Sequence, residues 1–429
     1  MVKKLHVHFM GIGGSGISAV ARMAKANGFN VSGCDIESSS IAHRLQKEGI
    51  PVTTEGHDPS HLRGTDILAH TSAVFYQSED HPELTKANNP MIWEEFMAKY
   101  LQKGKFVIAV AGTHGKGTTT AMLARVLETA GLDPTVEVGA NLLDWDRANY
   151  RIGKSKYFLC EADEYREKFL LYKPDLLVIT SIEMDHPDYF ADFGAVLEAF
   201  VKMAKQSKTV VINGEDPGCQ KLIRVMKTVK SIKIIKFKSL SKTQAKLKLP
   251  GDHVRSDAGG VWTAARELKI PEKAIKSGLE SFSGLERRFE YRGEADGVIY
   301  YDDYAHHPTA VEVNIKAARE MYPKHKIWVV FQPHMYSRLQ NLFDDFIKAL
   351  SMANKVVVTD VYSKREPGVN KPSGKELALA IGAPKATYVG GDLLNVANFV
   401  SRNSTKGDVI LNMGAGDVYK VSDILLEWR

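Results

Sequence analysis

The segment that decides the fold of this chain is Gly112-Thr113-His114-Gly115-Lys116-Gly117-Thr118. It follows the apolar run 106–110 and precedes a helical pattern over 119–129, so it predicts a strand, a glycine-rich turn and the start of a helix. Backbone N–H groups at such a helix N-terminus can surround phosphate. Lys116 can reach the β- and γ-phosphates, and the Thr118 hydroxyl can bind Mg²⁺. We therefore expect an ATP site formed by Gly112, Thr113, His114, Gly115, Lys116, Gly117 and Thr118.

The spacing of this loop differs from the general pattern G-x-x-x-x-G-K-[ST]. Gly112 lies only three positions before Gly115, and Gly117 stands where Ser or Thr usually follows the lysine. The alternative is an ordinary strand-to-helix turn. Because strand, glycine, lysine and helix signals coincide, we favour the phosphate loop.

Length and composition describe a multidomain globular protein. The chain has 429 residues, which is enough for two to four domains. Its hydrophobic content is 44% and its charged content 25%, and no run of about 18 apolar residues predicts a membrane span. A formal net charge of +6 suits anionic small substrates, and no arginine-rich tail or aromatic-interleaved basic patch indicates nucleic-acid binding.

The N-terminus and the cysteines indicate the compartment. Residues 1–5 lead almost at once into a predicted strand and lack the apolar region of a signal peptide, so we expect a cytoplasmic protein. Cys34, Cys160 and Cys219 are odd in number, widely spaced and without CxxC pairing. They predict reduced structural thiols rather than disulfides or a zinc site.

The first hundred residues carry a dinucleotide-binding pattern. A strand over 5–10 is followed by Gly11-Ile12-Gly13-Gly14-Ser15-Gly16, a helix over 17–27 and a second strand that ends at Asp35. Alone, this pattern would indicate NAD. A UDP-sugar also presents a pyrophosphate and a ribose, and suits the same groups. Our candidates for binding it are Gly11, Gly13, Gly14, Gly16, Asp35, His57 and Ser72, of which the last two could equally be polar residues of surface loops.

Two acidic clusters follow strands of the next segment. Glu161-Ala162-Asp163-Glu164 comes after the strand 156–160, and Glu183-Met184-Asp185-His186 comes after the strand 176–180. In open α/β sheets ligands sit at the carboxyl ends of strands, so both clusters should face the phosphate loop. Oxygen ligands suit Mg²⁺, and a neutral imidazole can join a second metal, which makes Glu161 and His186 candidate ligands. Helix capping is the alternative reading.

The alternation of strands and helices continues to the end of the chain. We predict an α/β fold with three domains, each on a largely parallel sheet. They are an N-terminal Rossmann-like domain (1–104), a central domain like that of P-loop ATPases (105–290) and a C-terminal Rossmann-like domain (291–429).

Taken together, the motifs resemble the Mur ligases, the ATP-dependent amino-acid ligases of peptidoglycan synthesis. The matches occur in family order over essentially the whole chain, and they comprise residues 11–16, 112–118, 161–164, 183–186, 287–289, 302–309 and 414–416. In residues 112–116, 304–309 and 331–334 the chain is most similar to the branch that attaches L-alanine.

The resemblance implies a substrate for each domain: UDP-N-acetylmuramate in the first, ATP with Mg²⁺ in the second and an amino acid in the third. It implies an acyl phosphate on the muramate carboxylate, which the amine then attacks. The implied catalytic residues are Lys116, Glu161, His186, Arg288 and His307, of which His307 either transfers protons or positions other groups. Thr118, Glu161 and His186 would hold metal, Asp257 and Arg288 would contact ATP, and His334 and Arg338 would bind the amino acid.

The chain departs from the family pattern at four places. Gly117 replaces a Thr, which moves the hydroxyl role to Thr118. Residues 253–257 depart from His-Asn-x-x-Asn, and Asp257 would accept from the adenine amino group instead. Met335 stands where many alanine-adding members carry Arg, and the segment 213–249 is short.

Three other functions remain open at this stage. One is a Mur ligase that uses another amino acid or a peptide, and another is a homologue that binds nucleotide without turnover. The third is a dehydrogenase that binds NAD at residues 11–16, which would leave the phosphate loop and the acidic clusters without a role.

Overall fold

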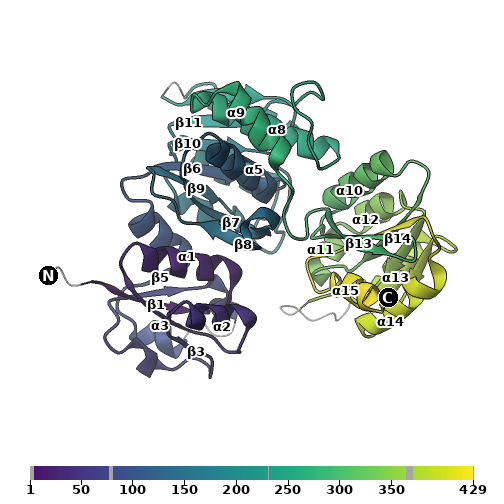
Figure 1. Ribbon diagram of the computed structural model, residues 1–429, viewed down its shortest axis with the longest axis horizontal. Coiled ribbons are helices and arrows are strands. Elements are labelled where there is room, and N and C mark those ends of the chain that lie inside the picture. The colour runs from purple at the N-terminus through teal and green to yellow at the C-terminus, as the bar shows by residue number, and fades with distance from the viewer. Residues whose placement is uncertain (1–3, 77–80, 230, 364–370, 429) are drawn as a thin grey trace.

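The computed structural model describes residues 4–76, 81–229, 231–363 and 371–428, which form three α/β domains, each on its own sheet (Figure 1). In Figure 1 the first domain (purple) lies below the central domain (blue to green), and the C-terminal domain (green to yellow) lies beside them. The prediction of three α/β domains with mainly parallel sheets is confirmed. Residues 1–3, which entered our expectation about a signal peptide, lie outside the described residues.

The first domain has a parallel five-stranded sheet in the order β3-β2-β1-β4-β5. The central strand β1 carries the apolar residues Val7, Phe9 and Met10, all buried, as expected of a strand covered on both faces. Its elements are β1 (His6–Met10), α1 (Ser15–Ala26), β2 (Asn30–Cys34), α2 (Ser40–Lys47), β3 (Val52–Thr53), η1 (Pro59–Leu62), β4 (Ile67–His70), η2 (Ser72–Tyr76), α3 (Pro82–Lys86), β5 (Pro90–Ile92), α4 (Trp93–Phe96) and η3 (Met97–Leu101).

The central domain has a seven-stranded sheet in the order β12-β11-β10-β6-β9-β7-β8, parallel except for the β7–β8 pair. The phosphate loop joins β6 to α5, and Gly115 with φ +80° precedes the first helical residue, Lys116. Its elements are β6 (Phe106–Ala111), α5 (Lys116–Thr129), β7 (Thr135–Leu142), η4 (Leu143–Trp145), β8 (Ala148–Arg151), β9 (Tyr157–Glu161), η5 (Tyr165–Leu171), β10 (Leu176–Ile179), α6 (Phe193–Lys205), β11 (Thr209–Asn213), α7 (Pro217–Met226), β12 (Lys233–Phe237), α8 (Asp252–Glu267) and α9 (Glu272–Ser281).

The C-terminal domain has a six-stranded sheet in the order β13-β14-β18-β15-β16-β17, in which only the β13–β14 pair is antiparallel within the described residues. The strands β14 and β15 end at the cavity described below, followed by Tyr304 and Gln332 respectively. Its elements are β13 (Glu290–Ala295), β14 (Val298–Asp303), α10 (Pro308–Met321), β15 (Lys326–Phe331), α11 (Tyr336–Asn341), α12 (Phe343–Leu350), β16 (Lys355–Val358), α13 (Gly374–Ile381), β17 (Ala386–Tyr388), α14 (Leu393–Asn403), β18 (Asp408–Met413) and α15 (Lys420–Glu427).

The apolar cores are not divided equally among the domains. One continuous cluster joins the first domain to one face of the central sheet, where Phe96 and Leu101 belong to the same core as Phe158 and Phe169. The other face of the central sheet packs against α5, α8 and α9. The C-terminal domain has two clusters of its own, one on each face of its sheet.

Two pairs of consecutive helices are separated by a change in backbone conformation. The helix α4 ends at Phe96 and continues as the π-helical turn η3. Leu342, whose φ of −119° is outside the helical region, separates α11 from α12. The predicted boundaries at 104 and 290 stay predictions; the first falls between η3 and β6, and the second falls at the start of β13.

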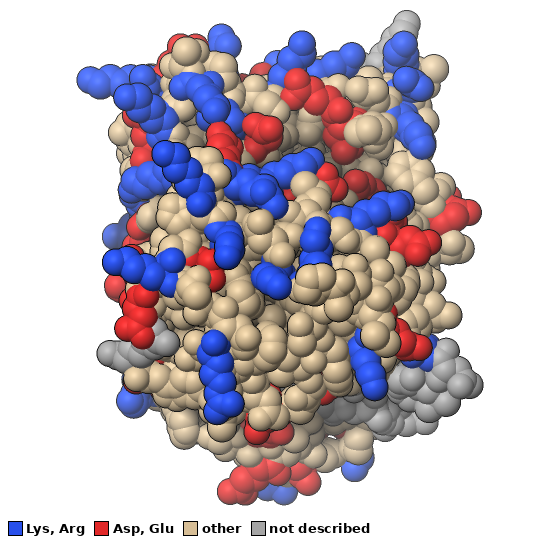
Figure 2. Space-filling view, turned by 90° about the vertical axis from the view of Figure 1, so that its right-hand side faces the viewer, with Lys and Arg blue, Asp and Glu red and all other residues tan. Residues whose placement is uncertain are grey.

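Two features of the described residues concern possible membrane and nucleic-acid partners: the composition of the helices and the charge on the surface. None of the described helices combines the length and the apolar composition needed to cross a bilayer. On the face formed by the C-terminal domain, Lys and Arg side chains are scattered with Asp and Glu side chains between them (Figure 2). Cys34, Cys160 and Cys219 are all free and buried.

Replacement of Gly278 by Ala should destabilise the protein, although Ala normally stabilises a helix by about 1 kcal/mol relative to Gly. Gly278 lies in α9 where it packs on α5, and a Cβ built there would stand 2.7 Å from the Val126 Cα. Relieving this overlap requires a backbone shift, which costs about 1–3 kcal/mol. We expect a lower urea midpoint for Gly278→Ala, whereas Ser277→Ala, at the exposed neighbouring position, should not lower it. Equal or higher stability of Gly278→Ala would contradict this packing.

Candidate functional site

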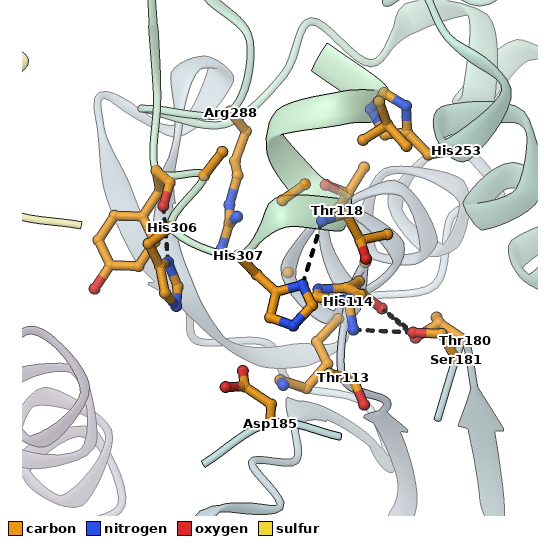
Figure 3. A pocket seen from close by; sticks show the side chains of 18 of the residues that line it. Thr113, His114, Thr118, Thr180, Ser181, Asp185, His253, Arg288, His306 and His307 are labelled. Atoms are coloured by element: carbon orange, nitrogen blue, oxygen red, sulfur yellow. Dashed lines mark hydrogen bonds between the residues drawn. The ribbon is translucent and has the colours of Figure 1, made fainter. Parts of the chain in front are cut away.

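A cavity of about 580 Å³ lies between the central and C-terminal domains (Figure 3). It is lined by the phosphate loop, by the residues that follow β9, β10, β14 and β15, by α8 and by Arg288. The first domain contributes none of the described residues that line it. The volume is in the range of small-molecule sites in proteins.

The phosphate loop is held tightly against two neighbouring elements. Gly112 has φ +144°, and a Cβ there would stand 2.0 Å from Thr180 Oγ1. Gly115 has φ +80°, and a Cβ there would stand 2.2 Å from Asp257 Oδ1. The backbone N–H of His114 donates to Ser181 Oγ at 2.9 Å, as Figure 3 shows. The end of β10 and helix α8 therefore fix the conformation of the loop.

Lys116 lies at the start of α5 with its amine directed into a group of carboxylates. Its Nζ donates to Gly112 O at 2.7 Å and to Glu164 Oε2 at 2.8 Å. Burial alone would lower the pKa of Lys116, but the carboxylates of Glu164, Asp163 and Glu161 together raise it above its usual value. The loop therefore carries a fixed positive charge, as phosphate binding requires.

One group of potential metal ligands follows β9 and β10. Asp163, Glu164 and His186 each offer one donor atom, and these three atoms lie within 4.8 Å of one another. Glu164 Oε1 is buried without a hydrogen-bond partner among the described residues, and the His186 Nε2 is 3.8 Å from it. Glu161, the predicted ligand, is outside this group and accepts from the Gly139 N–H at 2.8 Å. His186 was a candidate ligand from the sequence, and Glu161 stays a prediction; Asp163 and Glu164 of the same acidic cluster are further candidates that only the structure brings beside His186.

A second group brings His114 of the phosphate loop together with Glu183, which follows β10, and with residues at the start of α10 in the C-terminal domain. His114 Nε2 lies 2.8 Å from Glu183 Oε2, and the His114 and His307 rings are 4.9 Å apart. Thr309 Oγ1, from the C-terminal domain, donates to Glu183 Oε2 at 3.2 Å. Burial, together with the neighbouring His114, lowers the pKa of His307 to about 4. His307 is therefore neutral at pH 7, and its buried Nε2 has no partner among the described residues.

Arg338 forms an ion pair across the domain junction. Its Nη2 donates to Asp185 Oδ1 at 3.0 Å, and its Nη1 lies 3.2 Å from His334 Nδ1. Burial alone would raise the pKa of Asp185, but the Arg338 guanidinium holds it well below its usual range. The structure thus brings the two predicted amino-acid-binding residues together and pairs one of them with a carboxylate of the central domain.

Asp257 of α8 and Arg288, which lies between α9 and β13, both line the cavity. The Arg288 guanidinium carbon is 5.3 Å from the centre of the Tyr304 ring, which holds it over the cavity. Asp257 is buried behind Gly115, and this burial raises its pKa to about 8, against smaller opposing effects of Thr119 and Arg288. Its carboxyl group is therefore mainly protonated at pH 7 and can donate as well as accept a hydrogen bond.

The residues predicted to bind a UDP-sugar lie apart from this cavity. Gly13 N donates to Asp35 Oδ2 at 2.7 Å, so the glycine turn and the acid after β2 are in contact. Asn149 of the central domain donates to the backbone oxygen and the hydroxyl of Ser15, at 3.2 Å each. His57 is different, because its side chain is buried against Cys34 and Glu83, at 3.1 and 3.5 Å.

Three family models cover most of the chain. The Mur ligase family catalytic domain matches residues 6–103, the Mur ligase middle domain matches residues 110–270, and the glutamate ligase domain of Mur ligases matches residues 287–416. A UDP-N-acetylmuramate–L-alanine ligase from Acetivibrio thermocellus is 38% identical over 98% of this chain and 96% of its own. The chain belongs to the Mur ligase family.

Other Mur ligases match over the same length. A UDP-N-acetylmuramate–L-alanine ligase from Clostridium novyi is 34% identical over 98% of this chain and 97% of its own. The crystal structure of UDP-N-acetylmuramate-alanine ligase from Thermotoga maritima is 28% identical, with a TM-score of 0.81 and 99% of both chains covered. A murein peptide ligase from Psychrobacter arcticus shares the fold, with a TM-score of 0.70 at 20% identity.

The Mur ligase site includes a residue that sequence reasoning left without a role. Arg287 has φ +55° and lies beside Arg288, and its Nη2 donates to Gly414 O at 2.6 Å and to Gly416 O at 2.9 Å. It thereby links the domain junction to the loop after β18. The matches at 287–289 and 414–416 were the sequence signals for this contact, but neither indicates which arginine faces the cavity and which binds the loop.

Asp257→Asn should remove a pH-dependent loss of stability. Because burial raises the pKa of Asp257 from 3.8 to about 8, the native state keeps a proton that the unfolded state has released between these pH values. The stability of the wild type must therefore fall as pH rises through this window, by of order a few kcal/mol, whereas Asn is neutral throughout. We expect the variant to melt at a higher temperature than wild type at pH 8 and at a similar temperature near pH 4. Asp252→Asn, at an exposed position of the same helix, is the control, and parallel melting curves for wild type and Asp257→Asn would count against the buried proton.

Proposed function

We propose that this Mur ligase joins L-alanine to the carboxylate of UDP-N-acetylmuramate, with conversion of ATP to ADP and phosphate. The observation that carries the proposal is the identity of 34–38% to ligases of that name over nearly the whole chain. The phosphate loop and the acid and histidine groups around one cavity support it independently. We place the reaction in the cytoplasm, where the three free cysteines would stay reduced.

The residues around the cavity fit ATP and a divalent cation. The loop glycines leave the backbone of residues 112–117 bare for phosphate, and Lys116 supplies a buried positive charge beside it. Asp163, Glu164 and His186 offer oxygen and nitrogen donors within 4.8 Å of one another, and Glu164 has an oxygen without a partner. Mg²⁺ held there would offset negative charge on the phosphates. Thr118 and Glu161 remain our further candidate ligands.

The first step makes the substrate carboxylate reactive. A carboxylate oxygen attacks the γ-phosphorus, the bond to the β-phosphate oxygen breaks, and ADP leaves. Lys116, from the phosphate loop, and Arg288, from the segment between α9 and β13, would face the negative charge that moves during the transfer. Asp257, neutral at pH 7, would meet the adenine without adding a charge.

The second step forms the amide. The amine of alanine attacks the acyl phosphate, phosphate leaves with the electron pair of the C–O bond, and the amine gives up a proton. His307 would accept or position that proton, since it is neutral at pH 7 and its Nε2 has no partner among the described residues. His334 and Arg338 would bind the carboxylate of alanine, in which case the substrate replaces Asp185 as the partner of Arg338.

A peptide as the incoming amine is the second candidate. Met335 stands where many alanine-adding members carry Arg, and it lines the cavity at φ +66°. A UDP-N-acetylmuramate:L-alanyl-γ-D-glutamyl-meso-diaminopimelate ligase from Neisseria meningitides is 26% identical over 66% of this chain, with a TM-score of 0.60.

Phosphate release should require ATP, UDP-N-acetylmuramate and an amine together. Among L-alanine, glycine, L-serine and the tripeptide L-alanyl-γ-D-glutamyl-meso-diaminopimelate, L-alanine should give the highest kcat/KM. A higher kcat/KM for another of these amines would make that amine the substrate. Absence of phosphate release from the folded wild type with every amine would contradict the proposed ligase activity.

Lys116→Ala should lower turnover by about 100- to 1,000-fold or more, because a charge at the transferred phosphoryl group is lost. Lys205→Ala, at an exposed site on α6, is the control and should leave turnover unchanged. Turnover of the folded Lys116→Ala variant close to that of wild type would remove Lys116 from the mechanism.

Arg338→Ala should raise the KM for L-alanine by roughly 10- to 100-fold, as expected when a charged hydrogen-bond partner is lost. The KM for ATP should change much less, because ATP loses no direct partner. Asp185→Asn is the matched control: it weakens the same ion pair but leaves the guanidinium in place. If both variants raise the KM for alanine equally, Arg338 acts through the domain junction rather than by binding the amino acid.

A further inference from the structure

A third group of potential metal ligands lies in the first domain, outside the cavity. His8, Cys34, His61 and Glu83 each place one donor atom within 4.8 Å of the other three. They come from four separate elements, β1, β2, η1 and α3, so the group exists only in the folded domain. None of the four lines the cavity between the central and C-terminal domains.

Three distances between donor atoms of the group are near those of a tetrahedral site. His8 Nε2 is 3.2 Å from Cys34 Sγ, Glu83 Oε2 is 3.5 Å from the same sulfur, and His61 Nδ1 is 3.0 Å from Glu83 Oε1. Around a zinc ion with bonds of about 2.0–2.3 Å, neighbouring donors are roughly 3.3–3.7 Å apart. The four donor atoms all lie within 4.8 Å of one another, so the remaining pairs would close around the ion when it binds.

The buried carboxylate of Glu83 would be stabilised by a positive charge beside it. The side chain is fully buried, and its ion pairs in the described part of the chain are with two histidines, His57 and His61. A buried carboxylate is costly unless it is paired or binds a metal. A dication would balance two anionic ligands, a carboxylate and a thiolate, and leave neutral histidines as the remaining donors.

We propose that His8, Cys34, His61 and Glu83 bind a zinc-class transition-metal ion as a structural site. A thiolate and imidazoles favour such an ion over Mg²⁺, which prefers oxygen donors. Four protein ligands complete a tetrahedron and leave no open position for a reacting water. The proposal is independent of the ligase reaction, because it uses no residue of the cavity.

The His8 ring is oriented by a contact outside the group. Its Nδ1 lies 2.8 Å from Ser32 Oγ, and its Nε2 lies on the other side of the ring, toward the Cys34 sulfur. Outer contacts of this kind commonly fix the orientation of a metal-binding histidine.

The site would stabilise the loop that is predicted to bind the UDP-sugar. The Cys34 carbonyl accepts from the N–H groups of Gly11 and Ile12, at 2.8 and 3.1 Å. On the other side of the group, the Asp58 N–H donates to Glu83 Oε1 at 2.9 Å. A metal would therefore join the glycine turn, the segment around His61 and α3.

The test uses the full chain, stripped with a chelator and titrated with Co²⁺ and then Zn²⁺. We expect a thiolate-to-cobalt charge-transfer band that saturates at one equivalent and disappears when zinc displaces cobalt. Cys34→Ser should lose the band, and Cys219→Ser, which replaces a buried cysteine of α7, should keep it. The other two metal-binding groups contain no cysteine, so cobalt bound there cannot produce this band.

A second variant protects the test against misfolding of Cys34→Ser. Glu83→Gln should weaken zinc binding by roughly tenfold or more, the scale on which even outer-shell partners act. Zinc should raise the melting temperature of the stripped wild type by several degrees and that of Glu83→Gln by less, at equal zinc concentration. Absence of the cobalt band in folded wild type, or a band that persists in Cys34→Ser, would overturn the proposal.

Discussion

Two glycines of the phosphate loop leave no room for a side chain, and the arrangement of the site depends on that close packing. A Cβ at Gly112 would overlap Thr180, and one at Gly115 would overlap Asp257. Both glycines have positive φ, which an L side chain rarely adopts. The loop is therefore pressed between β10 and α8, and this contact directs the Lys116 amine toward the acids after β9. The same contact buries Asp257 and so accounts for its raised pKa.

The charged side chains of the cavity form ion pairs in which a substrate anion can take the place of the carboxylate. The Lys116 amine donates a hydrogen bond to Glu164, and the Arg338 guanidinium donates one to Asp185, so each of these largely buried cations has a carboxylate beside it. Taking such a pair out of water costs nearly as much as the attraction between its members returns. A phosphate or carboxylate of a substrate can therefore take over the cation at little net cost, and the released carboxylate of Glu164 would face a metal ion.

The sequence predicts local elements well and contacts between elements poorly. The strand, loop and helix around Lys116 follow from local pattern, and so does the glycine turn that meets Asp35. The metal-binding group at Cys34 could not be found this way, because its ligands come from four elements that only the parallel sheet brings together. The grouping of Asp163 and Glu164 with His186 could not be predicted either, since it depends on how the chain turns after β9.

The two domain junctions are held by different kinds of contact, and this difference determines which domains can move relative to each other. The first and central domains share one apolar core, in which Phe96 packs with the core around Phe158, and apolar surfaces of this kind resist separation. The apolar clusters of the C-terminal domain stay within that domain, and polar contacts such as Thr309–Glu183 and Arg338–Asp185 join it to the central domain. Polar contacts can be exchanged for contacts with substrate, whereas a shared core cannot be opened without exposing apolar surface. Closure around the substrates should therefore be a movement of the C-terminal domain against the other two, which move as one body.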